Sequence, residues 1–265
     1  MTRLPVRKTY KLFVGGEFPR SESGRTYEAE GQNVARGSRK DLRDAVRAAR
    51  GAFPKWAGLT AYNRGQVLYR VAEMMEARHG KFADLCSGPP EVERSIDRFV
   101  WYAGWADKIA QVLGSSNPVA GPYFNFTVPE PQGVVAILAP DEPPLAGLVS
   151  RIAPALVGGN AVVAVASPTH PLAAIELAEA LATADLPAGV VNIVTGLREE
   201  LAPVLASHMD VNAIDVSGAD GEVAELERLA AENVKRVVRG PTDDQSAWEI
   251  SRFLELKTVW HPIGV

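Results

Sequence analysis

Cys86 is the only cysteine in the chain, so it is the only side chain that could offer a thiolate nucleophile to a carbonyl carbon. Free cysteines are most often small core residues, and we therefore interpret Cys86 as structural. A single cysteine also permits neither an intramolecular disulfide nor a cysteine-based metal site.

The other titratable residues give no clear catalytic or metal-binding pattern. Asp141 and Glu142 could form a carboxylate pair for acid–base chemistry, but adjacent residues in a turn usually point apart and are solvated. The four histidines show no metal-ligand spacing, and we expect surface or helix-capping roles for them; they are His79, His170, His208 and His261. The residues alone therefore predict neither a catalytic residue nor a metal site.

The composition is that of an ordinary globular protein. Hydrophobic residues make up 46% of the 265 residues and charged residues 23%, with a formal net charge of −4 from mixed signs. This balance gives no electrostatic reason to expect nucleic acid or an anionic membrane as a partner. Without a basic patch, Trp101, Tyr102 and Trp105 indicate helix packing rather than base stacking.

No segment has the roughly 18 uninterrupted apolar residues that a membrane helix requires. The stretch from Met1 to Tyr10 lacks the apolar centre of a secretory signal. We therefore expect a cytoplasmic protein that does not interact with membranes.

Short apolar strands alternate with helical patterns from Gly133 onward. The fully apolar run Val134–Leu138 is typical of a strand that is covered on both faces. Further strands are expected at Ala161–Ala166, Val190–Val194, Ala213–Val216 and Arg236–Val238, and the intervening helices at Pro144–Leu156, Leu172–Ala184, Glu199–Ser207 and Glu222–Ala231. This alternation predicts an α/β fold, a doubly wound, Rossmann-like parallel sheet of about five strands.

Helices dominate the region that precedes this sheet. Ser38 and Asp41 have the spacing of a capping box at a helix start. Two further helices are expected at Asn63–Ala77, ended by Gly80, and at Glu91–Leu113. The first segment, Tyr10 to Glu28, predicts two short strands around a turn.

The end of the chain departs from the alternation. A short helix is expected at Asp243–Leu254, followed by the β-branched and aromatic strand Leu256–Trp260, which has no strand after it to pair with. The other isolated strand candidate is Tyr123–Val128. We expect the last strand to pair either with this segment or with another chain.

Several motifs are similar to those of the aldehyde dehydrogenase superfamily, and together they cover nearly the whole chain. They are Phe13–Phe18, Phe124–Thr127 with Glu130–Val135, Ile152–Asn160, Leu186–Gly196 with Ala206–His208, and Glu255–Trp260. The last motif resembles the end of these enzymes, and particularly the second module of two-module members. The chain has only about half of the usual length, and the resemblance breaks near Arg239-Gly240 and resumes before the last strand.

The resemblance implies a truncated member without the catalytic domain. Residues 1–240 would form a coenzyme-binding domain, with an oligomerisation-arm strand at about 118–132, and residues 241–265 the C-terminal helix and oligomerisation strand. In the family, the two arm segments reach a neighbouring subunit and extend the sheet of its catalytic domain.

The catalytic groups that the resemblance implies are missing. The family's nucleophilic cysteine lies far downstream of the position of Cys86. Glu142 stands in place of the asparagine that stabilises the oxyanion, and an ionised carboxylate there would repel developing negative charge. The segment that supplies the general base ends at Val238-Arg239-Gly240. No catalytic residue is therefore predicted.

The coenzyme contacts are also reduced to a remnant, which we assign to Pro140, Ser217 and Gly218. Val165 and Pro168 replace the lysine and glutamate that hold the adenosine ribose in the family, and neither can make those hydrogen bonds. Asp220 and Glu222 add negative charge where the pyrophosphate would lie. We expect no cofactor, or at most weak NAD(P) binding.

These expectations favour a catalytically inactive subunit that assembles through its arm strands with a full-length aldehyde dehydrogenase and stabilises or regulates it. Strand addition across an interface would satisfy edges that a two-stranded arm leaves open. The alternative is an NAD(P)-dependent aldehyde oxidoreductase whose site is completed by a partner subunit.

Overall fold

The fold is built on a five-stranded parallel sheet, as the sequence predicts. The computed structural model describes residues 8–219, 221, 223–240 and 245–264. The strands lie in the order β10-β9-β6-β7-β8 and are β6 (Val134–Leu138), β7 (Ala161–Val165), β8 (Val191–Val194), β9 (Ala213–Asp215) and β10 (Arg236–Val238). After β6, the chain forms β7 and β8 on one side of this strand and then β9 and β10 on its other side. The two halves of the sheet therefore diverge between β6 and β9.

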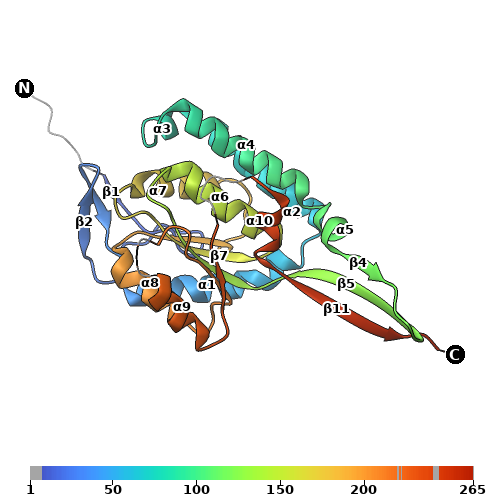
Figure 1. The fold of residues 1–265 in the computed structure, drawn as a ribbon. Coiled ribbons are helices and arrows are strands. Elements are labelled where there is room, and N and C mark those ends of the chain that lie inside the picture. The colour runs from blue at the N-terminus through green and yellow to red at the C-terminus, as the bar shows by residue number, and fades with distance from the viewer. Residues whose placement is uncertain (1–7, 220, 222, 241–244, 265) are drawn as a thin grey trace, which may run out of the picture.

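Helices cover both faces of this sheet (Figure 1). One face carries α1 (Arg39–Ala57), α8 (Arg198–Ser207) and α9 (Val223–Ala231). On α1, the predicted capping box is confirmed, because Ser38 accepts from the Asp41 N–H and the Asp41 carboxylate accepts from the Ser38 N–H.

Two layers of helices cover the opposite face of the sheet. It carries α6 (Pro144–Val157) and α7 (Pro171–Leu181), which lie beneath α2 (Ala61–Glu76) and α4 (Pro89–Trp105). All 14 residues of α6 are buried, because the helix is enclosed between the sheet and the outer helices. Its apolar character around the whole circumference follows from this position.

Two helix boundaries differ from the expectations. Gly80 does not end α2, which stops at Glu76, but lies inside the short helix α3 (His79–Ala83). The single helix expected at Glu91–Leu113 is divided into α4 and α5 (Ile109–Leu113), because the Lys108 N–H bonds to the Trp105 carbonyl in a tightened last turn.

The amino-terminal strands also pair differently from the expected hairpin. β1 (Thr9–Tyr10) and β2 (Thr26–Ala29) are not neighbours, because both pair with β3 (Gln32–Ala35), a strand that the sequence analysis missed. The β2–β3 turn uses Glu30 and Gly31, both at positive φ.

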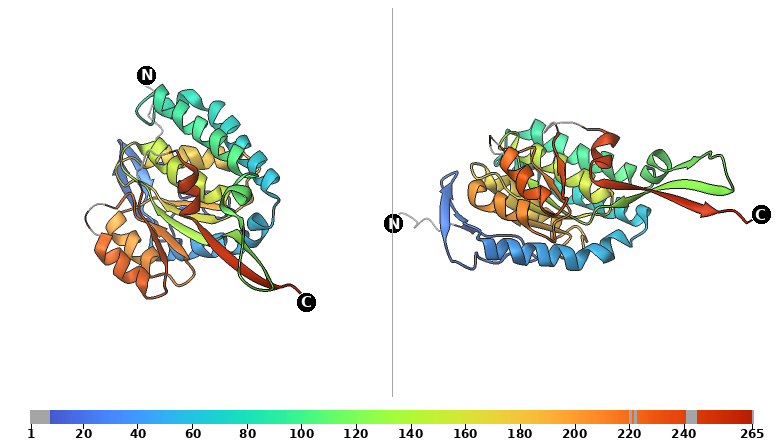
Figure 2. Two further views of the ribbon diagram at one scale, coloured as in Figure 1. Left: turned by 45° about the vertical axis from the view of Figure 1, so that its right-hand side comes forward. Right: turned by 60° about the horizontal axis from the view of Figure 1, so that its bottom comes forward.

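The arm is a separate three-stranded antiparallel sheet in the order β11-β5-β4. It consists of β4 (Ser115–Asn117), β5 (Tyr123–Pro131) and β11 (Leu254–Pro262). Nine residue pairs join β11 to β5, from Leu254–Pro131 to Pro262–Tyr123. Of the two partners expected for the last strand, the structure shows the Tyr123 segment. The arm projects away from the sheet and its helices (Figure 2).

The helix before β11 is shorter than expected. α10 covers Ala247–Ser251, and Leu254 belongs to the strand. Asp243, where this helix was expected to begin, lies outside the described residues, as do Asp220 and Glu222. The division of the chain into residues 1–240 and 241–265 stays a prediction.

Candidate functional site

The carboxyl ends of β6 and β9 mark the point where the two halves of the sheet diverge, which is where open α/β sheets bind ligands. Pro140 follows β6, and Ser217 and Gly218 follow β9, so the three predicted residues lie at this edge. A Cβ on Gly218 would lie only 2.4 Å from the carbonyl oxygen of Leu138. The turn after β9 therefore packs directly on the end of β6, and only glycine fits there.

The polar group of Ser217 is already used within the chain. Its hydroxyl accepts a hydrogen bond of 2.9 Å from the backbone N–H of Gly240, and its own N–H donates to the Asp215 carboxylate at 2.9 Å. Ser217 thus joins the ends of β9 and β10. The N–H that a cofactor phosphate would need as a donor is bonded to a carboxylate of the chain itself.

The amino terminus of α6 points into this edge and is covered by a carboxylate from α4. Glu91, which is 1% exposed, accepts hydrogen bonds from the N–H groups of Leu145 at 2.8 Å, Ala146 at 2.9 Å and Ser87 at 2.7 Å. Burial opposes ionisation, but these N–H groups outweigh it and hold the pKa of Glu91 below its ordinary value. The helix end that would attract an external anion holds an internal one instead.

Two further contacts occupy the same region. Pro140 lies against the first turn of α6, since a Cβ on Gly147 would come within 2.5 Å of the proline ring. At α7, the Glu30 carboxylate accepts from the Leu172 N–H at 3.2 Å. Two helix N-termini at the carboxyl edge of the sheet are therefore satisfied by side chains of the chain itself.

Asp141 and Glu142 point to different partners. Asp141 accepts hydrogen bonds from Arg198 and Ser167, each at 2.7 Å, and Arg198 also donates to the Ala139 carbonyl at 2.7 Å. Asp141, whose side chain is 32% exposed, is therefore tied to the turn after β7 and to the first residue of α8 rather than fully solvated. Glu142 is 67% exposed at its side chain and lies 3.4 Å from His170. The two carboxylates form no acid–base pair.

The remaining predicted positions offer no contact to a dinucleotide. Val165, the last residue of β7, is completely buried and has no polar side-chain atom. After it, Ser167 closes a tight turn by accepting from the N–H groups of Thr169 and His170. Pro168 lies within that turn. The ribose-binding pair that the resemblance implies has no substitute at these two positions.

Cys86 lies between α3 and α4 rather than at the carboxyl edge of the sheet. Its Sγ lies 3.7 Å from the Gly88 carbonyl, and burial together with the Glu91 carboxylate raises its pKa to about 12. The thiol is therefore protonated at neutral pH and is a poor nucleophile. This environment agrees with a structural role.

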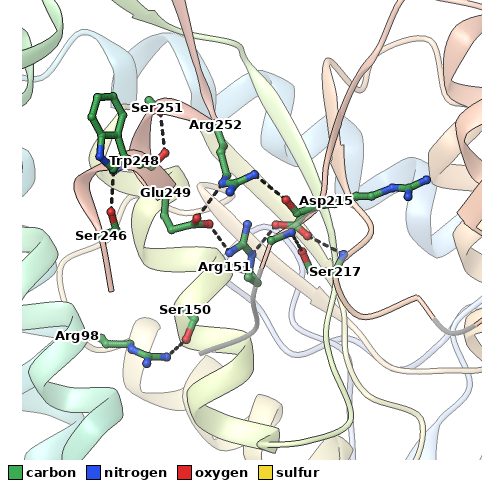
Figure 3. Close-up of polar contacts among 12 residues, drawn as sticks. Arg98, Ser150, Arg151, Asp215, Ser217, Ser246, Trp248, Glu249, Ser251 and Arg252 are labelled. Carbon is green, nitrogen blue, oxygen red and sulfur yellow. Dashed lines mark hydrogen bonds and ion pairs between the residues drawn. The ribbon is translucent and has the colours of Figure 1, made fainter. Parts of the chain in front are cut away.

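A buried ion network behind this edge joins the C-terminal segment to the sheet (Figure 3). Arg151 of α6 contacts Asp215 of β9 through Nε and Glu249 of α10 through Nη1, both at 2.6 Å. All three side chains are at most 1% exposed. Arg252 approaches the second oxygen of Glu249 at 2.7 Å. The network fixes the helix from which the arm strand β11 begins.

Neither this network nor the contacts of Glu91 were predicted from the sequence. The sequence offers two signals, because charged residues are rarely buried unless they are paired. They are Arg151 in the apolar stretch of α6 and Asp215 in β9. Their partner, Glu249, is distant in sequence, so the pairing required the fold.

No group of three or more His, Cys, Asp or Glu residues that could hold a metal ion occurs in the part of the chain that the structure describes. Over those same residues, no helix is long and apolar enough to cross a membrane.

The doubly wound parallel sheet with its divergent edge defines a Rossmann-like α/β fold. The model of the "Aldehyde dehydrogenase family" matches residues 25–239, and the chain belongs to this family. It is 35% identical over 252 residues to retinal dehydrogenase 2 of Homo sapiens, a match that covers 87% of this chain and 48% of the relative. It is also 34% identical over 255 residues to the mitochondrial benzaldehyde dehydrogenase of Antirrhinum majus, covering 88% and 47%.

Solved structures show the same relation. The crystal structure of HpcC from Thermus thermophilus superposes with a TM-score of 0.83 at 32% identity and covers 88% of this chain and 48% of that one. The NAD+ complex of aldehyde dehydrogenase from Bacillus cereus gives 0.80 at 27% identity, covering 87% and 50%. The chain thus spans about half the length of these relatives.

Proposed function

We propose that this chain is a catalytically inactive subunit that assembles through its arm with a full-length aldehyde dehydrogenase and stabilises or regulates that enzyme. The observation that carries the proposal is the arm itself. From Glu255 onward every residue of β11 is exposed, including Leu256 at 53% and Trp260 at 58%. An exposed strand edge with large apolar side chains is a surface that proteins normally pair or cover.

The proposed absence of catalysis rests on the residues at the carboxyl edge. The only thiol is protonated and lies elsewhere, and the exposed carboxylate of Glu142 stands where an oxyanion donor would be needed. The described residues also offer a dinucleotide few contacts, because Val165 and Pro168 cannot hold its ribose and the N–H of Ser217 is bonded to Asp215. We therefore propose that NAD(P) is not bound.

The second candidate is an NAD(P)-dependent aldehyde oxidoreductase whose site a partner subunit completes. The intact parallel sheet and the retained Pro140 and Gly218 favour it. It requires that Arg198 leave both Asp141 and the Ala139 carbonyl to open the edge. Millimolar NAD distinguishes the two candidates, since ligand at 100 times its dissociation constant raises stability by about 2.7 kcal/mol.

The direct test is affinity purification of the tagged, complete chain from its own host, with co-purifying proteins identified by mass spectrometry. The proposal predicts recovery of a full-length aldehyde dehydrogenase in a fixed ratio. Recovery of the chain without such a relative, at expression levels where both are present, would contradict it.

A further inference from the structure

The outer edge of β11 has a defined set of unpaired backbone groups. The Ile263 N–H donates to the Pro122 carbonyl at 2.8 Å, which makes Ile263 and Pro122 a hydrogen-bonded pair of the β11–β5 ladder. In an antiparallel ladder such pairs alternate, so His261, Val259 and Lys257 direct their N–H and C=O groups toward β5. The residues between them, Leu256, Thr258 and Trp260, direct theirs outward.

Both ends of this outward ladder are closed. At the base, the outward carbonyl of Leu254 accepts from Arg236 at 2.8 Å, and Arg236 also contacts the Glu255 carboxylate at 2.8 Å. At the tip, Pro262 has no N–H to donate. Leu256, Thr258 and Trp260 are therefore the residues of β11 that present both an N–H and a C=O group outward.

This short ladder is self-complementary. When two copies of β11 lie antiparallel with Thr258 facing Thr258, Leu256 of each copy faces Trp260 of the other, and all three outward residues enter hydrogen-bonded pairs. In the same register Glu255 faces His261 of the second copy, so a carboxylate meets an imidazole that can donate to it. A shift by two residues would place Pro262 or the occupied Leu254 in the ladder and lose these pairs.

We propose that two copies of this chain pair edge to edge through β11 about a two-fold axis at Thr258. The two arms then form one six-stranded sheet, β4-β5-β11-β11-β5-β4. The arm projects from the body of each molecule, so the two bodies lie at opposite ends of this sheet (Figure 2). Pairing of two copies does not depend on the proposed assembly with a full-length relative, which would compete for the same edge.

The symmetry gives a geometric test. In a chain with Cys86→Ala, Thr258→Cys places two cysteines on the axis, about 5.5 Å apart at Cα, within the range that a disulfide spans. Trp260→Cys is the matched control, because the two copies of position 260 would be about 13 Å apart along the strands. Under mild oxidation we expect Thr258→Cys to form covalent dimers at least tenfold faster than Trp260→Cys. Equal rates of dimer formation by the two variants would contradict the pairing of Thr258 with Thr258.

A second test distinguishes the outward backbone hydrogen bonds of β11 from the contact of the Thr258 side chain. Thr258→Pro removes an outward N–H while leaving the bonds to β5, whereas Thr258→Val retains that N–H. Both variants lose the Thr127–Thr258 hydroxyl contact of 3.2 Å. In sedimentation velocity of the purified protein, we expect a concentration-dependent dimer for the wild type and Thr258→Val, and a monomer for Thr258→Pro with an unchanged circular dichroism spectrum.

The wild type itself can refute the pairing. A protein that stays monomeric at about 100 µM, roughly 100 times a micromolar dissociation constant, would show that the two edges do not associate. That result would leave the assembly with a full-length relative open, because the host purification tests it separately.

Discussion

The carboxyl edge of the parallel sheet and the arm differ in whether their backbone groups are hydrogen-bonded within the chain. At the sheet edge, Glu91 and Glu30 cover helix ends and Ser217 accepts from Gly240, so the chain satisfies itself where open α/β sheets bind ligands. In the arm, Leu256 to Trp260 leave a ladder open and apolar side chains exposed. This contrast supports the proposal that the arm, rather than the edge of the sheet, is the surface that binds a partner.

The largest effect is expected from breaking the buried network that connects the two regions. Arg151→Ala leaves the buried Asp215 carboxylate without its cation and Glu249 with Arg252 alone, which costs about 3–5 kcal/mol of unfolding free energy. Equilibrium denaturation measures it. The matched control is Arg228→Ala, which removes an exposed pair with Glu225 and should leave the denaturation midpoint nearly unchanged. Similar losses in the two variants would contradict the role of the network.

A smaller loss, about 1.5–3 kcal/mol in total, is expected from Glu91→Ala, because the N–H groups of Leu145, Ala146 and Ser87 lose a charged acceptor and water can replace part of it. The pH dependence sharpens the test. The pKa of Glu91 is lowered in the folded state, so its contribution is present above the unfolded value of about 4.3 and is lost as the pH falls through the lower folded value. Glu91→Gln should flatten the decline in stability below about pH 5. A decline as steep as that of the wild type would exclude this contribution.

The arm should contribute little to the stability of the isolated chain. Trp260→Ser removes a side chain that is 58% exposed, and we expect a change within about 0.5 kcal/mol in denaturation while association is reduced. A loss of more than about 2 kcal/mol would show that the arm is part of the core rather than a surface for partners.

The smallest expected effect is the change in thermal midpoint when NAD is added. Because the groups at the sheet edge are internally bonded, millimolar NAD should not shift the thermal midpoint of the purified chain. A positive shift would show that the edge opens, and would favour the oxidoreductase alternative.

Local patterns predicted most of the fold. The capping box at Ser38, the alternating strands from Val134 and the last strand follow from short-range spacing, and the structure confirms them. The strand Gln32–Ala35 was missed because it is short and polar at one end, and the break at residues 106–108 because the helical pattern continues through it. Helix and strand ends depend on single turns that periodicity does not resolve.

The site was predictable only in part. Pro140, Ser217 and Gly218 could be placed at one edge from strand order, but the sequence does not show what each group contacts. Glu91 reaches α6 over 54 residues and Glu249 reaches Arg151 over 98, so these pairings depend on packing between distant elements. The assignment of Pro140, Ser217 and Gly218 as a remnant of a cofactor site stays a prediction.

The proposal that the arm is the recognition surface can be tested directly with two exposed tryptophans. Trp260 on the arm and Trp248 on α10 are 58% and 70% exposed, and each can be changed to glutamate in the tagged chain. We predict that Trp248→Glu recovers a full-length aldehyde dehydrogenase from the host as efficiently as the wild type, while Trp260→Glu loses most of it, roughly the tenfold drop that 1.4 kcal/mol of lost affinity gives. Equal recovery by both variants would contradict the account.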